Sequence, residues 1–121
     1  MRWSGYSNSK YHNSKITVAG ERFDSQGEYN RWCELKLLEK AGRIRDLKRQ
    51  VYFELIPAQY EIDEKGRRRL VERALGYVAD YVYLEDGKTV VEDYKGLQTE
   101  AFKIKKKLML YLKGIKVKLS K

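Results

Sequence analysis

The first regular pattern of apolar positions along the chain has the period of a helix. Its members fall on one stripe of a helical surface and are Trp32, Leu35 and Leu38. Ser25 and Glu28 stand ahead of this stripe at the S-x-x-E spacing of a capping box, and Gly42 follows it as a stop signal. The pattern predicts a helix over about residues 26–41.

Strand-like patterns lie on both sides of this helix. Residues 16–18 and 21–23 flank Ala19-Gly20 as a short hairpin. Residues 51–56 are rich in β-formers and end at Pro57, which suits a strand terminus or a sheet edge. The sequence thus predicts a hairpin before the helix and a strand after it.

A second hairpin is indicated further along the chain. After a charged turn, residues 67–84 have the pattern of one long strand, or of two strands with a bulge near Gly76. The dipeptide Asp86-Gly87 is a tight-turn signal. It predicts that residues 77–84 and 89–95 pair as antiparallel strands.

A second helix and a last strand follow Gly96. Residues spaced as the inner face of this helix are Phe102, Met109 and Leu112, with lysines on its outer face and Gly114 as its stop. The alternating residues Ile115, Val117 and Leu119 predict a half-exposed strand. The order of elements predicts an α/β (α+β) fold, with a mixed central β-sheet flanked by helices.

The domain organisation predicted by these patterns is simple. Residues 1–14 are rich in Ser, Asn, Tyr and Gly and predict a polar N-terminal arm, while residues 15–121 form a single domain. With 121 residues, the chain has little room for a second domain.

The charge of the chain points to polyanionic partners. There are 26 Lys and Arg against 17 Asp and Glu, which gives a formal net charge of +9. Such an excess favours nucleic acid as the partner, with an acidic small-molecule substrate as the alternative. The longest apolar run, residues 108–112, is far shorter than the roughly 20 residues that cross a bilayer, and the first residues do not begin a signal peptide. A cytoplasmic protein without a membrane partner is expected.

Cysteine and histidine are too scarce for several kinds of site. One Cys and one His exclude an internal disulfide and a Cys/His zinc site. A metal ion would have to be held mainly by carboxylates, which suits Mg²⁺ or Mn²⁺. No small-molecule cofactor is expected.

The predicted second hairpin carries an acid on each of its apolar arms. Asp80 shares a strand face with Val78 and Val82, and Asp93 shares a face with Val91 and Lys95, because strand side chains alternate. A charge among apolar neighbours is costly unless it is paired or bound to a metal. If the two faces coincide, the two aspartates and the lysine lie within a few ångströms of one another.

Two adjacent carboxylates repel each other, and a divalent cation between them keeps both ionised. Lys95 would then position a water molecule, or stabilise charge that develops on a phosphate in the transition state. The cation would lower the pKa of a water molecule and polarise the phosphate. These residue types in this pattern point to phosphodiester cleavage.

The string Asp80, with Asp93-Tyr94-Lys95 thirteen residues later, resembles the D…(D/E)-x-K signature of the PD-(D/E)XK nuclease superfamily. Ala79 stands where the superfamily name has proline. Longer stretches are similar to a phage and prophage family that is grouped with small phage Holliday-junction resolvases of the endonuclease I kind. They are residues 11–13 through 23–25, the helix that carries Glu28, and residues 53–57, 77–80 and 91–96.

The resemblance implies a restriction-endonuclease-like core and a Mg²⁺-dependent endodeoxyribonuclease that cuts branched DNA such as a Holliday junction. It implies that Asp80, Asp93 and Glu28 hold the metal and that Lys95 joins them in catalysis. Glu28 matches the further acid that such nucleases carry on the first helix. A homodimer is implied as well, since a four-way junction needs two symmetric cuts. Such an enzyme, encoded by a phage or prophage, would act in the bacterial host cell.

Basic residues outside the acid cluster are candidates for phosphate contact. They are Lys103, Lys106 and Lys107 on the second helix, with Arg67 and Arg68 beyond the charged turn. The alternative is that these side chains form a solvated face and keep the chain in solution.

Structural interpretations of the acids remain open at this point. Asp80 and Asp93 could be exposed and paired with nearby Lys or Arg, and Glu28 already has a place in the capping box. Glu92 faces away from Asp93 in a regular strand and is expected to be solvated or salt-bridged, although a bulge would exchange the two. The rival functions are a non-catalytic, basic nucleic-acid-binding protein and a nicking or flap nuclease with the same site.

Overall fold

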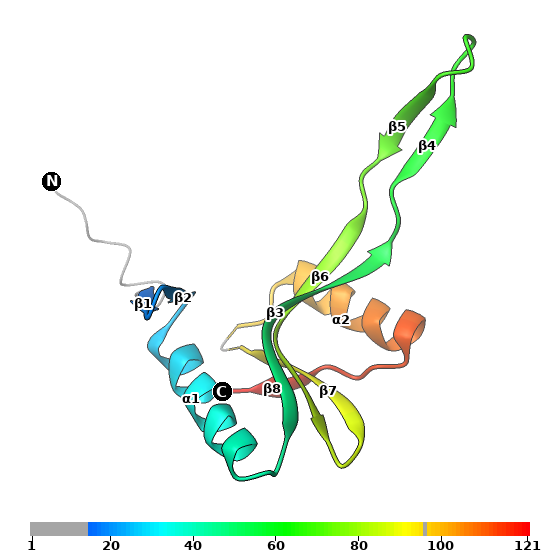
Figure 1. The fold of residues 1–121 in the computed structure, drawn as a ribbon. Helices are drawn as coiled ribbons and strands as arrows, with labels where there is room; N and C mark the ends of the chain where they lie inside the picture. Colours follow the sequence, from blue (N-terminus) through cyan, green and yellow to red (C-terminus); the bar gives the residue numbers. More distant parts are fainter. Residues whose placement is uncertain (1–14, 96) are drawn as a thin grey trace, which may run out of the picture.

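A computed structural model describes residues 15–95 and 97–121. The predicted polar arm over residues 1–14 lies outside the described residues. In chain order the elements are β1 (Ile16–Val18), β2 (Glu21–Phe23), α1 (Gln26–Lys40), β3 (Arg45–Ile56), β4 (Gln59–Ile62), β5 (Arg68–Glu72), β6 (Leu75–Glu85), β7 (Lys88–Tyr94), α2 (Glu100–Lys113) and β8 (Lys118–Ser120). They form a mixed α+β fold around a central sheet (Figure 1), as the order of patterns predicts.

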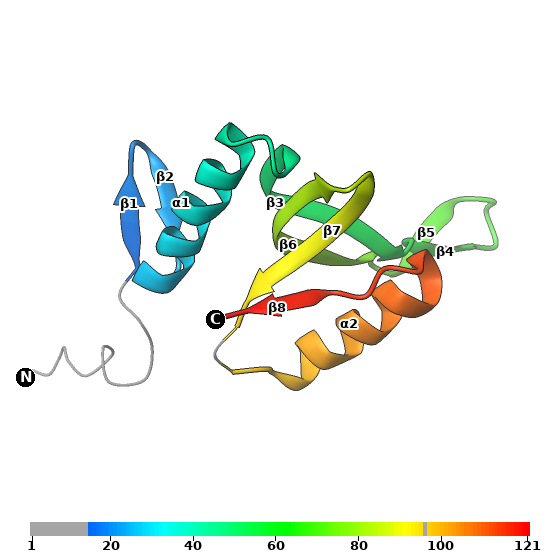
Figure 2. The same ribbon diagram turned by 90° about the horizontal axis from the view of Figure 1, so that it is seen from below.

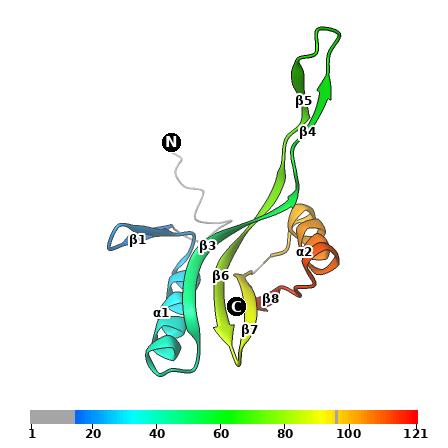
Figure 3. The ribbon, with the colours of Figure 1, turned by 45° about the vertical axis from the view of Figure 1, so that its right-hand side comes forward.

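The central sheet has four strands in the order β3-β6-β7-β8. β3 pairs with β6 and β6 pairs with β7 in antiparallel orientation, while β8 pairs in parallel with β7. The turn between β6 and β7 lies at Asp86-Gly87, as predicted, and both residues have positive φ angles. α1 and α2 lie on opposite sides of the sheet (Figures 1 and 3). The β6–β7 hairpin therefore lies in the middle of the fold.

Each helix covers its own apolar cluster on the sheet. Under α1, the buried residues are Leu35, Ile44, Tyr81 and Tyr83, with Trp32 and Leu38 packed against them. Under α2 they are Leu55, Tyr77, Ala79, Val91, Phe102, Met109 and Val117. β6 contributes to both clusters, so its backbone is fixed from both sides.

The sequence places the ends of α1 nearly where the structure has them. The side chain of Ser25 accepts a hydrogen bond from the Glu28 amide at 3.1 Å, which is the first half of the predicted capping box. The helix ends at Lys40, and Gly42 follows it with a φ of 80°. In the second half of a capping box, the Glu28 carboxylate would accept from the Ser25 backbone amide. Here it accepts a hydrogen bond from Arg49 instead.

Two strand and helix predictions differ from the structure in detail, and the structure decides between two alternatives in a third. β3 begins at Arg45, six residues before the predicted strand, because pairing with β6 orders a polar segment with low strand propensity. Residues 67–84 form two strands, β5 and β6, which is the second of the two predicted alternatives. Leu112 is wrongly assigned to the inner face of α2, since 47% of it is exposed near the end of the helix.

β4 and β5 form a two-stranded ribbon that leaves the central sheet after Ile56 and extends away from it (Figures 1 and 3). All residues of both strands are exposed. The guanidinium group of Arg68 lies 3.7 Å from the ring centroid of Tyr60. Figure 2 shows the ribbon continuing from β3 and β6 at the end of the molecule far from β1 and β2. Among the described residues, no helix is long and apolar enough to span a membrane.

Candidate active site

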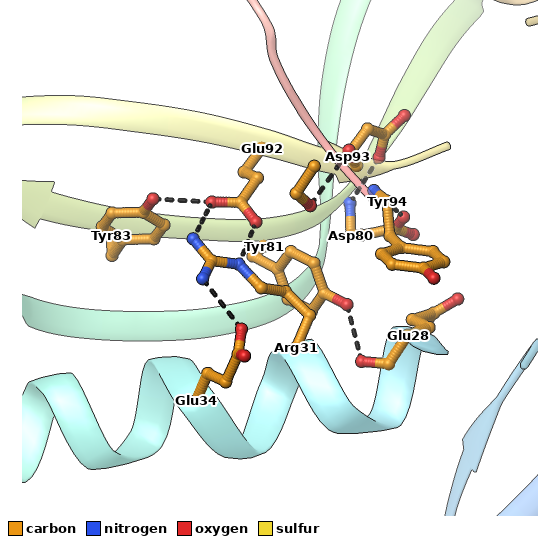
Figure 4. A network of polar contacts seen from close by, with 10 residues as sticks. Glu28, Arg31, Glu34, Asp80, Tyr81, Tyr83, Glu92, Asp93 and Tyr94 are labelled. Carbon is orange, nitrogen blue, oxygen red and sulfur yellow. Dashed lines mark hydrogen bonds and ion pairs between the residues drawn. The ribbon is translucent and has the colours of Figure 1, made fainter. Parts of the chain in front are cut away.

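The candidate site lies where β6 and β7 separate. Tyr81 and Glu92 are the last paired residues before the separation. Beyond them, side chains replace the backbone ladder: the Asp80 amide donates to Asp93 Oδ1 at 2.9 Å, and the Tyr94 amide donates to Asp80 Oδ2 at 2.9 Å (Figure 4). Each aspartate thus satisfies a backbone amide of the opposite strand. This crossed pair of hydrogen bonds fixes both carboxylates side by side.

One oxygen of each carboxylate is not used by these backbone bonds. Among the described residues, Asp80 Oδ1 accepts only a 3.3 Å hydrogen bond from the Gln50 side chain, and Asp93 Oδ2 lies 3.6 Å from Lys95 Nζ. Asp93 is fully buried and Lys95 is half-buried. The structure therefore brings together the three residues that the strand alternation predicts on one face.

The acid pair carries more negative charge than its surroundings neutralise. Burial, followed by the charges of Asp93 and Glu28, raises the pKa of Asp80 to about 7, against the opposing effects of the Tyr94 amide and Lys95. In the absence of a cation, this carboxyl group therefore takes up a proton near neutral pH. A divalent cation would reverse this preference, because it stabilises the ionised form of both carboxylates.

Glu28 lies in the first turn of α1, and its carboxylate is almost fully buried. Arg49 Nη2 donates to Glu28 Oε2 at 3.3 Å, while the same guanidinium group lies 3.9 Å from the ring centroid of Phe23. Burial, and then the charge of Asp24, raise the pKa of Glu28 above its usual range despite Arg49. Tyr81 Oη donates to the Glu28 backbone oxygen at 2.7 Å, which ties α1 to β6.

The Glu28 side chain points from α1 toward Asp80 and Tyr94 (Figure 4). However, no group of three or more His, Cys, Asp or Glu side chains within residues 15–95 and 97–121 is arranged to hold a metal ion. The site therefore consists of an aspartate pair with Lys95 beside it and with Glu28 nearby, held by Arg49.

Glu92 belongs to a buried network on the other face of β7. Arg31 holds it with two hydrogen bonds, Nε to Oε2 at 2.6 Å and Nη2 to Oε1 at 3.1 Å, and Tyr83 Oη donates to Oε1 at 2.7 Å. Burial alone would raise the pKa of Glu92, but these hydrogen bonds outweigh it and lower the pKa below its usual range. Glu92 faces away from Asp93 and is salt-bridged, as predicted; the alternative of a solvated side chain is wrong, because Glu92 is fully buried.

Several residues around the acids are not found by sequence reasoning. Arg31 links α1 to β7, and Gln50 and Arg49 reach the acids from β3. These residues lie in polar stretches of α1 and β3 that contain no recognisable motif. The position of Arg31, three residues after Glu28 on the same helix, is the one signal that could have placed it near the acid cluster.

The basic residues predicted to contact phosphate lie on two separate surfaces. On α2, Lys103 pairs with Glu100 at 3.2 Å and Lys106 donates to the Gln98 side chain at 3.2 Å, while Lys107 is exposed. Arg68 is the first residue of β5 on the ribbon, and Arg67 lies in the turn between β4 and β5, where it pairs with Asp63 at 2.9 Å. α2 begins five residues after Lys95, whereas the ribbon extends away from the central sheet (Figure 1).

Comparison with known proteins identifies one family and no individual relative. A family model described as "Protein of unknown function (DUF1064)" matches residues 8–120. No curated protein and no solved structure matches the chain.

Proposed function

The chain belongs to this DUF1064 family, and we propose that it is a metal-dependent DNA endonuclease that hydrolyses phosphodiester bonds. The observation that carries the proposal is the pair of aspartates at the separation of β6 and β7, with one oxygen of each directed away from the backbone and Lys95 beside them. The resemblance of Asp80 and Asp93-Tyr94-Lys95 to the nuclease signature supports the same conclusion.

The donor set fits a small divalent cation. Asp80 and Asp93 each keep one carboxylate oxygen outside the crossed hydrogen bonds, and hard oxygen donors are the ligands that Mg²⁺ and Mn²⁺ prefer. Mg²⁺ is commonly bound by one or two carboxylates and retains several waters, so a third protein ligand is not required. Glu28 would join the pair, directly or through a water molecule, if it left Arg49. When bound, the cation would polarise the phosphate and lower the pKa of an attacking water.

The other groups of the site then have defined tasks. The ammonium group of Lys95, 3.6 Å from Asp93 Oδ2, would orient the attacking water or stabilise the charge that develops on the phosphate oxygens. The crossed hydrogen bonds keep the carboxylates from rotating, so the donor oxygens are positioned before substrate binds. Arg49 would hold Glu28 until substrate or cation competes for it.

We propose branched DNA, such as a Holliday junction, as the substrate, and a homodimer acting in the cytoplasm of a bacterial host as the working form. The net charge of +9 supports binding to phosphate. Basic residues on both α2 and the ribbon, which extends away from the central sheet, suit contacts to separate arms of a branched molecule better than to one short duplex. A two-fold enzyme would supply the two symmetric cuts that a junction needs.

The test is cleavage of a synthetic four-way junction, a flap and a linear duplex, each with Mg²⁺, with Mn²⁺ and with EDTA. Asp80→Asn and Asp93→Asn remove a charge but retain an oxygen for the backbone amide, and we expect each to lower the cleavage rate at least about 100-fold. Asp86→Asn is the matched control: it makes the same chemical change on the same hairpin, at an exposed turn whose positive φ asparagine tolerates.

Binding measured in EDTA separates the proposal from its main rival. If the protein binds these DNAs but cleaves none of them with any divalent ion, it is a non-catalytic nucleic-acid-binding protein, and the aspartates serve only to join the strands. If it cuts flaps or single strands of a duplex but leaves the junction intact, the reaction class holds and the branched substrate does not.

A further inference from the structure

A pocket opens beside the aspartate pair, on the side that faces α2. It has a volume of about 280 Å³, and the residues that matter here are Tyr77, Asp93, Lys95, Thr99, Phe102 and Lys105. Asp93 and Lys95 therefore border both the candidate cation site and this pocket. Thr99 is the N-cap residue of α2, so the pocket includes the amino-terminal end of a helix of 14 residues.

Tyr77 gives the pocket a buried polar group without a partner. Only 3% of the residue is exposed, and its hydroxyl has no hydrogen-bond partner among the described residues. Burial, and then the charge of Asp93, raise the pKa of Tyr77 well above its usual range, so the hydroxyl keeps its proton. A buried hydroxyl without a partner is costly, and structures tolerate it mainly where water or a ligand supplies the missing bond.

Two lysines supply positive charge around the same pocket. Lys95 Nζ lies 3.6 Å from Asp93 and 4.8 Å from the Phe102 ring centroid. Lys105 is half-buried and forms no ion pair among the described residues. The Phe102 amide donates to the Thr99 side chain at 3.1 Å, which leaves the Glu100 and Ala101 amides to supply the positive end of the helix dipole. The pocket thus combines a proton donor, an uncompensated cation and helix amides.

We infer that this pocket binds a phosphate group of the nucleic-acid backbone, next to the phosphate that is cut. Lys105, the Tyr77 hydroxyl and the first turn of α2 form this subsite, and Lys95 borders both the subsite and the aspartate pair. The inference rests on the proposed function for its substrate. Phosphate binding itself does not depend on cleavage, because it requires only positive charge and N–H or O–H donors.

A phosphate in this pocket would position the strand relative to the acids. Consecutive phosphates are linked covalently, so holding one limits where its neighbour can lie. Asp93 lines the same pocket and repels an anion, and Lys95, which also lines the pocket and lies 3.6 Å from Asp93 Oδ2, reduces that repulsion. The subsite is therefore expected to bind more tightly when the aspartate pair holds a divalent cation.

The test is a ¹H–¹⁵N NMR titration of the full chain with inorganic phosphate, in EDTA and at constant ionic strength. We expect saturable shifts at the amides of residues 99–102 and at Tyr77 and Lys95. Lys105→Gln should weaken phosphate binding about fivefold. Lys113→Gln, the same change on an exposed residue in the last turn of the same helix, should leave the affinity within about 1.5-fold of wild type.

Tyr77→Phe gives a readout that a purely structural role would not produce. It removes a hydroxyl that lacks a partner among the described residues, so the melting temperature should stay the same or rise, while phosphate binding weakens about threefold. A lower melting temperature with unchanged phosphate binding would overturn the assignment of Tyr77 to the subsite.

The outcomes separate this inference from the proposed nuclease. If phosphate shifts the pocket amides and Lys105→Gln weakens that effect, while no DNA is cut with any divalent ion, the subsite stands and the proposed reaction fails. If DNA is cut but phosphate shifts no pocket amide, or shifts the amides of lysines all over the surface equally, the subsite is overturned and the reaction stands.

Discussion

Replacing Arg31 by methionine would remove the cation that holds the buried carboxylate of Glu92. Arg31 makes two hydrogen bonds to Glu92, and the Glu92 side chain has no exposed surface. Methionine keeps much of the length and apolar contact of the arginine stem. The change therefore removes the charge and leaves an ionised group buried with Tyr83 as its remaining donor.

The expected loss follows from the burial of the two partners. Removing one partner of a buried ion pair costs about 3–5 kcal/mol, because the other charge is left uncompensated. The Arg31 side chain is 21% exposed and Tyr83 still donates to Glu92, so we place the loss at the lower end, about 3 kcal/mol. For a chain of this size, that corresponds to a fall in melting temperature of roughly 10 °C.

Urea denaturation followed by circular dichroism, at several pH values, measures this loss. The pKa of Glu92 is lowered in the wild-type fold, so its contribution to the free energy of unfolding is present above the unfolded value of 4.5 and is lost as the pH falls. In the Arg31→Met variant burial is no longer opposed by the guanidinium group, and the pKa of Glu92 should rise. The difference in the free energy of unfolding between wild type and variant should therefore be smaller at pH 5 than at pH 7.

The double variant Arg31→Met/Glu92→Gln tests the reason for the loss. A neutral side chain at position 92 still accepts from Tyr83 without a buried charge, so about 2 kcal/mol of the 3 should return. A loss below about 1 kcal/mol in the single variant, or a double variant no more stable than the single, would refute the reasoning.

Three further predictions concern other parts of the fold. Asp80→Asn should raise the free energy of unfolding in EDTA at pH 8 by about 1–2 kcal/mol, measured by urea denaturation, and this advantage should vanish toward pH 4. The sign follows from the raised pKa of Asp80, about 7. The contribution of Asp80 to the free energy of unfolding is fully present below the unfolded pKa of 3.8 and is lost as the pH rises through 7, so the variant gains most at high pH. A gain independent of pH would contradict this reasoning. Gly27→Ala should lower stability by about 1–3 kcal/mol, since the new Cβ would clash with the Tyr94 hydroxyl group and ring; adding Tyr94→Leu should recover part of that loss in thermal denaturation. Hydrogen exchange should be faster for the ribbon amides of β4 and β5 than for β6, because all ribbon residues are exposed, and equal protection would count against this description.

The parts of the fold that depend on local signals could be predicted from the sequence. Ser25 and Gly42 mark the ends of α1 because capping is a matter of a few neighbouring residues. The tight turn at Asp86-Gly87 fixes the register of β6 and β7, and strand alternation then puts Asp80 and Asp93 on one face. The central acids of the candidate site could thus be placed from residues within a single hairpin.

The parts that depend on distant contacts could not be predicted. The first half of β3 is polar and has positive φ angles of 54° at Asp46 and 52° at Gln50, so its strand pairing exists only because β6 lies beside it. Likewise, the partner of Glu92 is Arg31, which lies 61 positions away. Spacing along the chain contains no information about such a pair.

The parallel pairing of β7 with β8 sets an order of events during translation. The Lys95 amide donates to the Ser120 backbone oxygen at 3.0 Å, and the Ser120 hydroxyl donates to the Asp93 backbone oxygen at 3.4 Å. All of α2 is synthesised between these residues, at about 5–20 residues per second. The β6–β7 hairpin thus leaves the ribosome without its outer neighbour. The backbone around Asp93 and Lys95 acquires its last hydrogen bonds only when residues 118–120 emerge.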